Sequence, residues 1–133
     1  QRLHAVKLLL DTQVFLWMVS NASELSPKAR RLAVAGENFL YLSLASVWEM
    51  AIKISLGKLK LAEPIESFIT EALLENNIRQ LEINFRHVAR VADLPFHHRD
   101  PFDRLLVSQA QVEDLHILSA DKAFDRYEVR RLW

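Results

Sequence analysis

The sequence predicts an α/β fold, a three-layer α/β/α sandwich around a mostly parallel sheet. Short apolar runs, the length of buried strands, alternate along the chain with longer stretches in which apolar residues recur at helical spacing. Two of the apolar runs stop abruptly at an aspartate, Asp11 and Asp121. Helices that connect successive parallel strands cover both faces of their sheet, which gives three layers.

The length and composition of the chain narrow the classes of protein to consider. Its 133 residues are half apolar and contain neither a repeat nor a Ser/Gly/Pro-rich linker, so we expect one domain over residues 1–133. The lack of cysteine excludes disulfide scaffolds and thiolate metal sites, and it suits the cytoplasm.

Because apolar runs stay well short of the ~20 residues of a membrane span, we expect no membrane partner. The 17 basic and 17 acidic side chains give a net charge of 17 − 17 = 0, unlike a generic nucleic-acid coat protein.

The first part of the chain is predicted to form a strand and two helices. Residues 5–10 form an apolar run of strand length, and residues 12–19 follow as a helix. The dipeptide Ser26-Pro27 begins the next helix, since serine caps a helix N-terminus and proline suits the first helical position. Gly36 is expected to end that helix.

The middle of the chain begins with an aromatic and aliphatic strand at 39–42. Ser46 and Glu49 have the spacing of a capping box, which predicts a helix that starts at Ser46 and continues to about residue 56. Gly57 is the expected stop.

The remaining elements are predicted from the same two periodicities and from helix start and stop signals. Pro64 and Pro101 each open a helix, while Asn84 caps a third one that Pro95 ends. The resulting elements are helices at 64–74, 84–94 and 101–115, and strands at 80–83, 116–119 and 129–132, the last at a sheet edge.

Four acidic residues are predicted to meet at one edge of this sheet. Asp11 and Asp121 directly follow apolar strands, while Glu49 and Asp103 lie near the starts of apolar helices. Parallel strands end at the same edge, and the helices that follow them begin there. We therefore expect the four carboxylates to converge at this edge.

Convergent carboxylates point to a bound cation. They repel one another, which raises their pKa values unless a cation neutralises them. Oxygen ligands without cysteine fit a hard divalent ion, Mg²⁺ or Mn²⁺. Such an ion activates water and stabilises the charge that develops on a phosphodiester during hydrolysis. The predicted chemistry is metal-dependent hydrolysis.

Each acid also has a purely structural interpretation. Asp11 could cap the first helix, and Glu49 could complete the capping box with Ser46. Asp103 could pair with a neighbouring arginine in the first helical turn, and Asp121 could be a turn residue. The functional hypothesis is favoured because all four acids are predicted at one edge of one sheet.

Four segments resemble the acid-bearing motifs of PIN-domain ribonucleases, in particular those of VapC-type toxins from bacterial type II toxin-antitoxin pairs. The resemblance extends over nearly the whole chain, and the motifs occur in the same order. The segments are Leu8-Leu9-Leu10-Asp11-Thr12, Ser46-Val47-Trp48-Glu49-Met50-Ala51-Ile52-Lys53, His98-Arg99-Asp100-Pro101-Phe102-Asp103-Arg104-Leu105-Leu106, and Ser119-Ala120-Asp121-Lys122-Ala123-Phe124.

This resemblance implies a PIN-like fold and Mg²⁺- or Mn²⁺-dependent endonucleolytic cleavage of RNA. It also implies a homodimer and a cognate antitoxin protein as partners. Residues 1–5 precede the usual start of the family and are interpreted as an extension. Asp100 is a secondary acid, and the four principal acids, carried over by position, are Asp11, Glu49, Asp103 and Asp121.

The resemblance and the chemistry together suggest a role for each residue. Glu49 is expected to bind the metal or to orient the attacking water, and Thr12 and Ser119 to supply supporting hydroxyl groups. The other three acids are expected to bind the metal through oxygen: Asp11, Asp103 and Asp121.

Substrate phosphates need positive charge beside the acids. The segment 28–60 carries six basic and two acidic side chains, a local balance of 6 − 2 = +4. The candidates for phosphate contact are Lys53, Arg99 and Arg104.

Other conspicuous residues are interpreted without a role in catalysis. Trp48 is more typical of a core residue than of a base-stacking one. His97 and His98 are explained by a loop before a helix and are left outside the site. The apolar faces of the first two helices exceed the needs of one small core, so we expect this surface to serve the dimer or the antitoxin.

Two other functions are weighed against the ribonuclease. A receiver-like signalling domain with a phosphoacceptor aspartate would also be α/β, but it needs paired acids early in the chain and a lysine after the last strand, and neither is evident. An inactive PIN-fold module that only binds protein or RNA is disfavoured by the complete set of four acids.

Overall fold

A parallel sheet of five strands forms the centre of the molecule. The computed structural model describes residues 5–133, so residues 1–4 of the expected extension lie outside the described part. The strand order is β3-β2-β1-β4-β5, and every neighbouring pair is parallel. The strands are β1 (Lys7–Leu10), β2 (Phe39–Ser43), β3 (Ile78–Leu81), β4 (His116–Leu118) and β5 (Arg131–Leu132).

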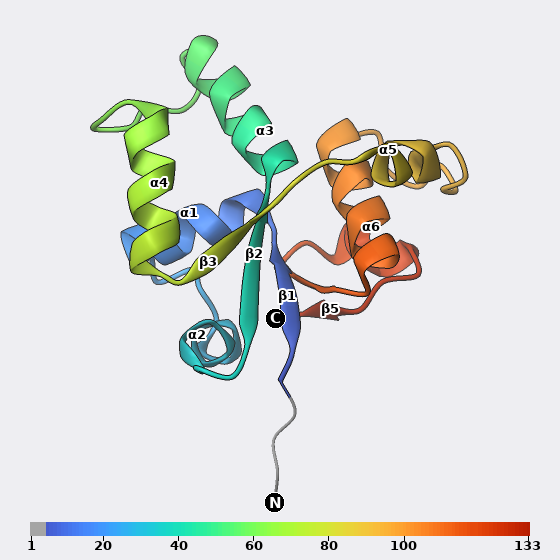
Figure 1. Cartoon of the computed structure of the whole chain (residues 1–133), viewed down its shortest axis with the longest axis horizontal. Coiled ribbons are helices and arrows are strands. Elements are labelled where there is room, and N and C mark those ends of the chain that lie inside the picture. Colours follow the sequence, from blue (N-terminus) through green and yellow to red (C-terminus); the bar gives the residue numbers. More distant parts are fainter. Residues whose placement is uncertain (1–4) are drawn as a thin grey trace, which may run out of the picture.

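Helices cover both faces of the sheet (Figure 1). On one face lie α1 (Thr12–Ser20), α2 (Pro27–Val34) and α4 (Ile65–Glu75). On the other face lies α6 (Pro101–Glu113), against which α5 (Phe85–Val91) packs. The remaining elements are α3 (Leu44–Ser55), which continues outward from the end of β2, and a short 3₁₀ helix, η1 (Lys122–Arg126). Within residues 5–133, none of these helices is long and apolar enough to cross a membrane.

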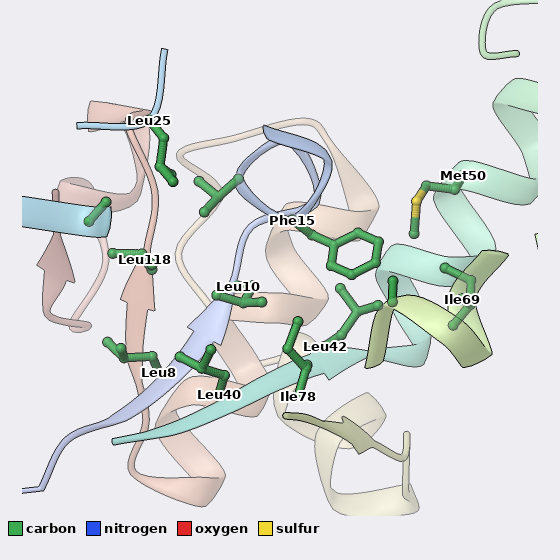
Figure 2. Close-up of a cluster of buried hydrophobic side chains, with 13 residues drawn as sticks. Leu8, Leu10, Phe15, Leu25, Leu40, Leu42, Met50, Ile69, Ile78 and Leu118 are labelled. Atoms are coloured by element: carbon green, nitrogen blue, oxygen red, sulfur yellow. The ribbon is translucent and has the colours of Figure 1, made fainter. Parts of the chain in front are cut away.

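The leucines of β1 supply both hydrophobic cores. Leu8 and Leu10 pack in one cluster with Phe15 of α1, and all three are drawn in the close-up of Figure 2. Leu9 points to the opposite face and packs in a second cluster with Leu106 of α6. A strand buried on both faces is apolar throughout, which is why β1 shows no alternation in the sequence. The predicted three-layer α/β/α sandwich is confirmed.

The third strand begins two residues earlier than the sequence predicts, at Ile78 instead of residue 80. Asn77 has a φ of 53°, and this left-handed conformation turns the chain out of α4 directly into the strand. Ile78 is buried and pairs with Leu40 of β2. Ile83, which was expected to end the strand, lies beyond it and packs partly buried against the second cluster.

The predicted start of α3 is wrong by a similar amount. The helix begins at Leu44, and Ser43 is its N-cap, with Ser43 Oγ accepting a hydrogen bond from the amide of Ala45 at 2.9 Å. Glu49 therefore lies in the second turn, so it does not form a capping box with Ser46. The spacing of three residues instead places the side chains of Ser46 and Glu49 on one face of the helix.

A buried hydrogen bond joins α3 to α6. The hydroxyl of Ser43 donates to Oε1 of Gln109 at 2.6 Å, and Nε2 of Gln109 donates to the carbonyl of Glu82 at 3.2 Å. Ser43 and Gln109 are both fully buried. The bond ties the N-cap of one helix to the middle of the other, so it fixes how the two helices sit relative to each other.

Replacement of Gln109 is expected to destabilise the fold. Gln109→Ala leaves the Ser43 hydroxyl and the Glu82 carbonyl without their partner and opens a small cavity, which should lower the free energy of unfolding by about 2 kcal/mol. Urea denaturation followed by circular dichroism measures the change. Gln111→Ala, on the partly exposed side of the same helix, is the matched control, and an equal loss in both variants would contradict the assignment.

Candidate active site

The carboxyl-terminal edge of the sheet holds a cavity of about 220 Å³. Five carboxylates from four parts of the chain line it, together with two lysines, Lys53 and Lys58. The structure thus brings together the four acids expected from the sequence and the secondary acid as well. The five carboxylates are those of Asp11, Glu49, Asp100, Asp103 and Asp121.

Asp11 lies between the end of β1 and the start of α1. Its amide donates to the carbonyl of Leu118 at 3.1 Å, and Oγ of Ser119 donates to its Oδ2 at 2.7 Å. Asp11 occupies the N-cap position, but its side chain makes no capping hydrogen bond. Burial raises the pKa of Asp11, the Ser119 hydrogen bond opposes this rise, and the negative charge of Glu49 adds to it.

Glu49 has both carboxylate oxygens engaged. Oγ1 of Thr12 lies 2.8 Å from Oε1 of Glu49 and 2.8 Å from Oγ of Ser46. An ionised carboxylate can only accept, so Thr12 donates to Glu49 and accepts from Ser46. Nζ of Lys53 lies 2.9 Å from Oε2 of Glu49, and this hydrogen bond raises the pKa of Lys53.

Asp100 and Asp103 lie together at the start of α6 but have different surroundings. Asp100 is the N-cap, and its Oδ1 accepts from the amides of Phe102 at 2.8 Å and Asp103 at 3.1 Å. The side chain of Asp103 is only 16% exposed. The pKa of Asp103 is raised to about 8, first by burial and then by the negative charges of the other carboxylates, with Asp100 the largest of these. A carboxylate in these surroundings takes up a proton or a cation.

Asp121 follows β4 at the same edge. Its amide donates to Oγ of Ser119 at 3.0 Å, and its Oδ1 accepts from the amide of Ala123 at 2.9 Å, at the start of η1. The predicted turn function is therefore present, and it uses one oxygen of a carboxylate that also lines the cavity.

His98 joins the site, although the sequence interpretation leaves it outside. Its Nε2 is 3.2 Å from Oδ2 of Asp103, and ligand atoms of His98, Asp103 and Asp121 all lie within 4.8 Å of one another. The amide of Asp100 donates to Nδ1 of His98 at 3.2 Å, which places the proton of a neutral ring on Nε2. Nε2–H then faces Asp103 as a donor, so His98 orients a carboxylate and has no lone pair on Nε2 for a metal. Its place inside the third acid-bearing motif is the signal that could have identified it.

The three basic residues expected to contact phosphates lie in different surroundings. Lys53 lines the cavity, whereas Arg99 is exposed and lies outside the lining. Arg104 donates to the carbonyls of Pro95 at 3.0 Å and Val91 at 3.2 Å, so its guanidinium group ties down the loop before α6. The structure therefore gives Arg104 a structural role, and we do not retain it as a phosphate ligand.

A larger cavity, of about 680 Å³, lies away from the acids. Its lining includes Arg90, His116 and Arg130 and none of the site residues expected from the sequence. Within the described part of the chain, Nδ1 of His116 is buried without a hydrogen-bond partner. Size therefore does not identify the candidate active site. The gathering of five carboxylates does, since the pKa values of two of them, Asp11 and Asp103, are raised.

Comparison with known proteins places this arrangement in a family. Residues 8–129 match the family model of the PIN domain. No curated protein matches the chain by sequence. Several solved structures have a similar fold. VapBC2 from Rickettsia felis, bound to a fragment of promoter DNA, has a TM-score of 0.71 at 14% identity over 96% of this chain and 98% of that one.

Two further structures have the same fold at similarly low identity. DNA-bound VapBC from Salmonella typhimurium has a TM-score of 0.67 at 15% identity, covering 96% of this chain and 97% of that one. FitAcB from Neisseria gonorrhoeae has a TM-score of 0.57 at 18% identity, covering 95% and 96%. The structural likeness shows the shared fold, and the family match extends over most of the sequence. The chain therefore belongs to the PIN domain family.

Proposed function

We propose that this protein is a metal-dependent endoribonuclease that hydrolyses phosphodiester bonds of RNA. The observation that carries the proposal is the raised pKa of Asp103, to about 8, among four other carboxylates at the end of a parallel sheet. A fold pays a stability cost to keep acids together, and such perturbed groups gather at functional sites. The PIN domain family is one of nucleases, which fits hydrolysis.

The donor atoms of the site fit Mg²⁺ or Mn²⁺. The candidate ligands are carboxylate oxygens of Asp11, Asp103 and Asp121. Glu49 is either a fourth ligand or the residue that orients the attacking water. Hard divalent ions prefer oxygen, and the nearby imidazole of His98 presents a donor proton to Asp103. When bound, the ion supplies activation of water and stabilises negative charge on the phosphate.

The chain itself supplies the positioning for this chemistry. Ser119 holds one oxygen of Asp11, and His98 holds one oxygen of Asp103. Each carboxylate is therefore kept in a fixed orientation, with its other oxygen available to a metal. Thr12 and Lys53 hold the two oxygens of Glu49, which suits a role in orienting the attacking water. Preset orientation of this kind lowers the reorganisation needed in the transition state.

Positive charge within the cavity suits a phosphate backbone. Lys53 and Lys58 line the cavity, and exposed Arg99 lies in the loop before α6. Lys58 is one of the basic side chains of the segment 28–60, and it takes the place of Arg104 as a candidate for phosphate contact. Neutralisation of phosphates by such side chains makes binding weaker as salt is added.

We also propose that the protein acts as the toxin of a toxin-antitoxin pair and forms a homodimer. The support is the resemblance of its four motifs to VapC-type toxins, together with the shared fold of the VapBC and FitAcB structures. An antitoxin would act by blocking the acidic cavity. Cleavage of RNA by the chain alone, suppressed by a cognate antitoxin, is the expected behaviour.

Loss of the first acid is expected to abolish cleavage. Asp11→Asn keeps the shape of the side chain and removes a charged oxygen ligand, so Mg²⁺- or Mn²⁺-dependent cleavage of total RNA should fall by at least about 100-fold. Gel analysis with mapping of the cleaved ends measures this. Asp93→Asn, at an exposed aspartate outside the cavity lining, is the matched control and should cleave as the wild type does. Equal cleavage by both variants would refute the proposal.

The raised pKa of Asp103 predicts how stability varies with pH in the metal-free protein. The folded protein retains a proton on Asp103 up to about pH 8, whereas the unfolded chain loses it near the usual pKa of 3.8. The free energy of unfolding should therefore fall as the pH rises between these values.

Asp103→Asn, which cannot ionise, should raise the free energy of unfolding at pH 8 by on the order of 1 kcal/mol or more, and should leave it nearly unchanged at about pH 4. Chemical denaturation with a chelator present measures both. Added Mn²⁺ should stabilise the wild type and not the variant. A variant that is less stable than the wild type at pH 8 would show that Asp103 is not a strained carboxylate.

A further inference from the structure

The two helices that carry acids each present an aromatic side chain directly before the acid. Trp48 precedes Glu49 on α3, and Phe102 precedes Asp103 on α6. The ring centroids of Trp48 and Phe102 are 5.0 Å apart, with the ring planes at 81°. Trp48 is 57% exposed, so the expectation that it is a core residue is wrong.

We infer that Trp48 and Phe102 form a stacking site for a nucleobase of single-stranded RNA, next to the phosphate that the acids act on. The inference rests on the proposed ribonuclease function. Neither ring belongs to the lining of the cavity, but each occupies the chain position directly before an acid that does, so the pair lies beside the cavity. In a nucleotide the base is separated from its phosphate by one sugar, so a base beside the cavity is compatible with its phosphate inside it.

The geometry of the pair suits stacking. In an edge-to-face pair each ring covers at most one face of the other. Trp48 is more than half exposed, so one face of its indole is available for a third ring. Contact with Phe102 restricts the rotation of Trp48, which reduces the entropy lost when a base binds. Every base has a π-face, so stacking tolerates sequence variation, and the site is expected to bind any base.

Charge around the pair also favours a nucleic acid. Lys53, five residues after Trp48 on α3 and paired with Glu49, lines the neighbouring cavity together with Lys58. The combination of lysines that contact the backbone and exposed aromatic rings is typical of sites for single strands. The other two tryptophans, Trp17 and Trp133, pack against each other at 5.9 Å and against the first hydrophobic cluster. A change of indole emission on binding therefore reports mainly on Trp48.

The test measures the binding of two oligonucleotides to the Asp11→Asn protein, which is not expected to cleave them. One is an adenosine oligoribonucleotide of about 12 nucleotides, and the other is a ribose-phosphate chain of equal length without bases. The adenosine strand should quench the tryptophan emission and bind about tenfold more tightly than the abasic strand.

Variants in the same background attribute the effect to Trp48. Trp48→Ala should weaken adenosine binding about tenfold and leave abasic binding unchanged, while Trp48→Phe should retain most of the affinity and lose the quenching. Leu74→Ala, a matched loss of an 83% exposed apolar side chain at the opposite end of the sheet, should change neither affinity.

Three results would overturn the stacking site. These are equal affinity for both strands, an equal effect of Trp48→Ala on both, or Trp48 emission that depends on protein concentration without RNA, which would show that a second copy covers the ring. If the wild type cleaves RNA in these cases, the proposed function stands and the stacking site alone fails. If it neither cleaves RNA nor binds either strand, the proposed function fails too.

Discussion

The candidate active site depends on the position of β1 between β2 and β4. The parallel register places Leu10 opposite Leu118, so the amide of Asp11 reaches the Leu118 carbonyl at 3.1 Å. The same register brings the hydroxyl of Ser119 to within 2.7 Å of the Asp11 carboxylate. A slip of one residue would turn the leucines of β1 to the wrong faces and would remove Asp11 from both contacts. Burial of these leucines therefore fixes the first acid of the site.

The neutral charge of the whole chain conceals an uneven distribution. The 17 acidic and 17 basic side chains cancel, yet five carboxylates and only two lysines line the cavity. Lys53 compensates Glu49, while Asp11 and Asp103 keep raised pKa values. Neutrality is thus no argument against an RNA substrate, because a bound cation would offset the acids, and Lys58 adds a positive charge to the same cavity.

The sequence predicts those features that depend on neighbouring residues. Helices such as α2 and α6 begin at a polar cap followed by proline, and both signals are local. The start of α3 was misplaced because Ser43 and Ser46 are equally good caps by type, and the choice depends on a buried bond to Gln109 from a distant helix. The contact between His98 and Asp103 likewise depends on how the loop before α6 folds back, which no local pattern encodes.

Hydroxyl groups hold two of the acids in place without neutralising them. Thr12 donates to Glu49 at 2.8 Å, and Ser119 donates to Asp11 at 2.7 Å. A hydroxyl fixes the position of a carboxylate without cancelling its charge, whereas an arginine or lysine does both. The carboxylates are therefore held in place while much of their charge stays unbalanced, and this is the condition under which a divalent cation binds well. An ion-pair network at this edge would make the fold more stable and would remove the reason for a cation to bind.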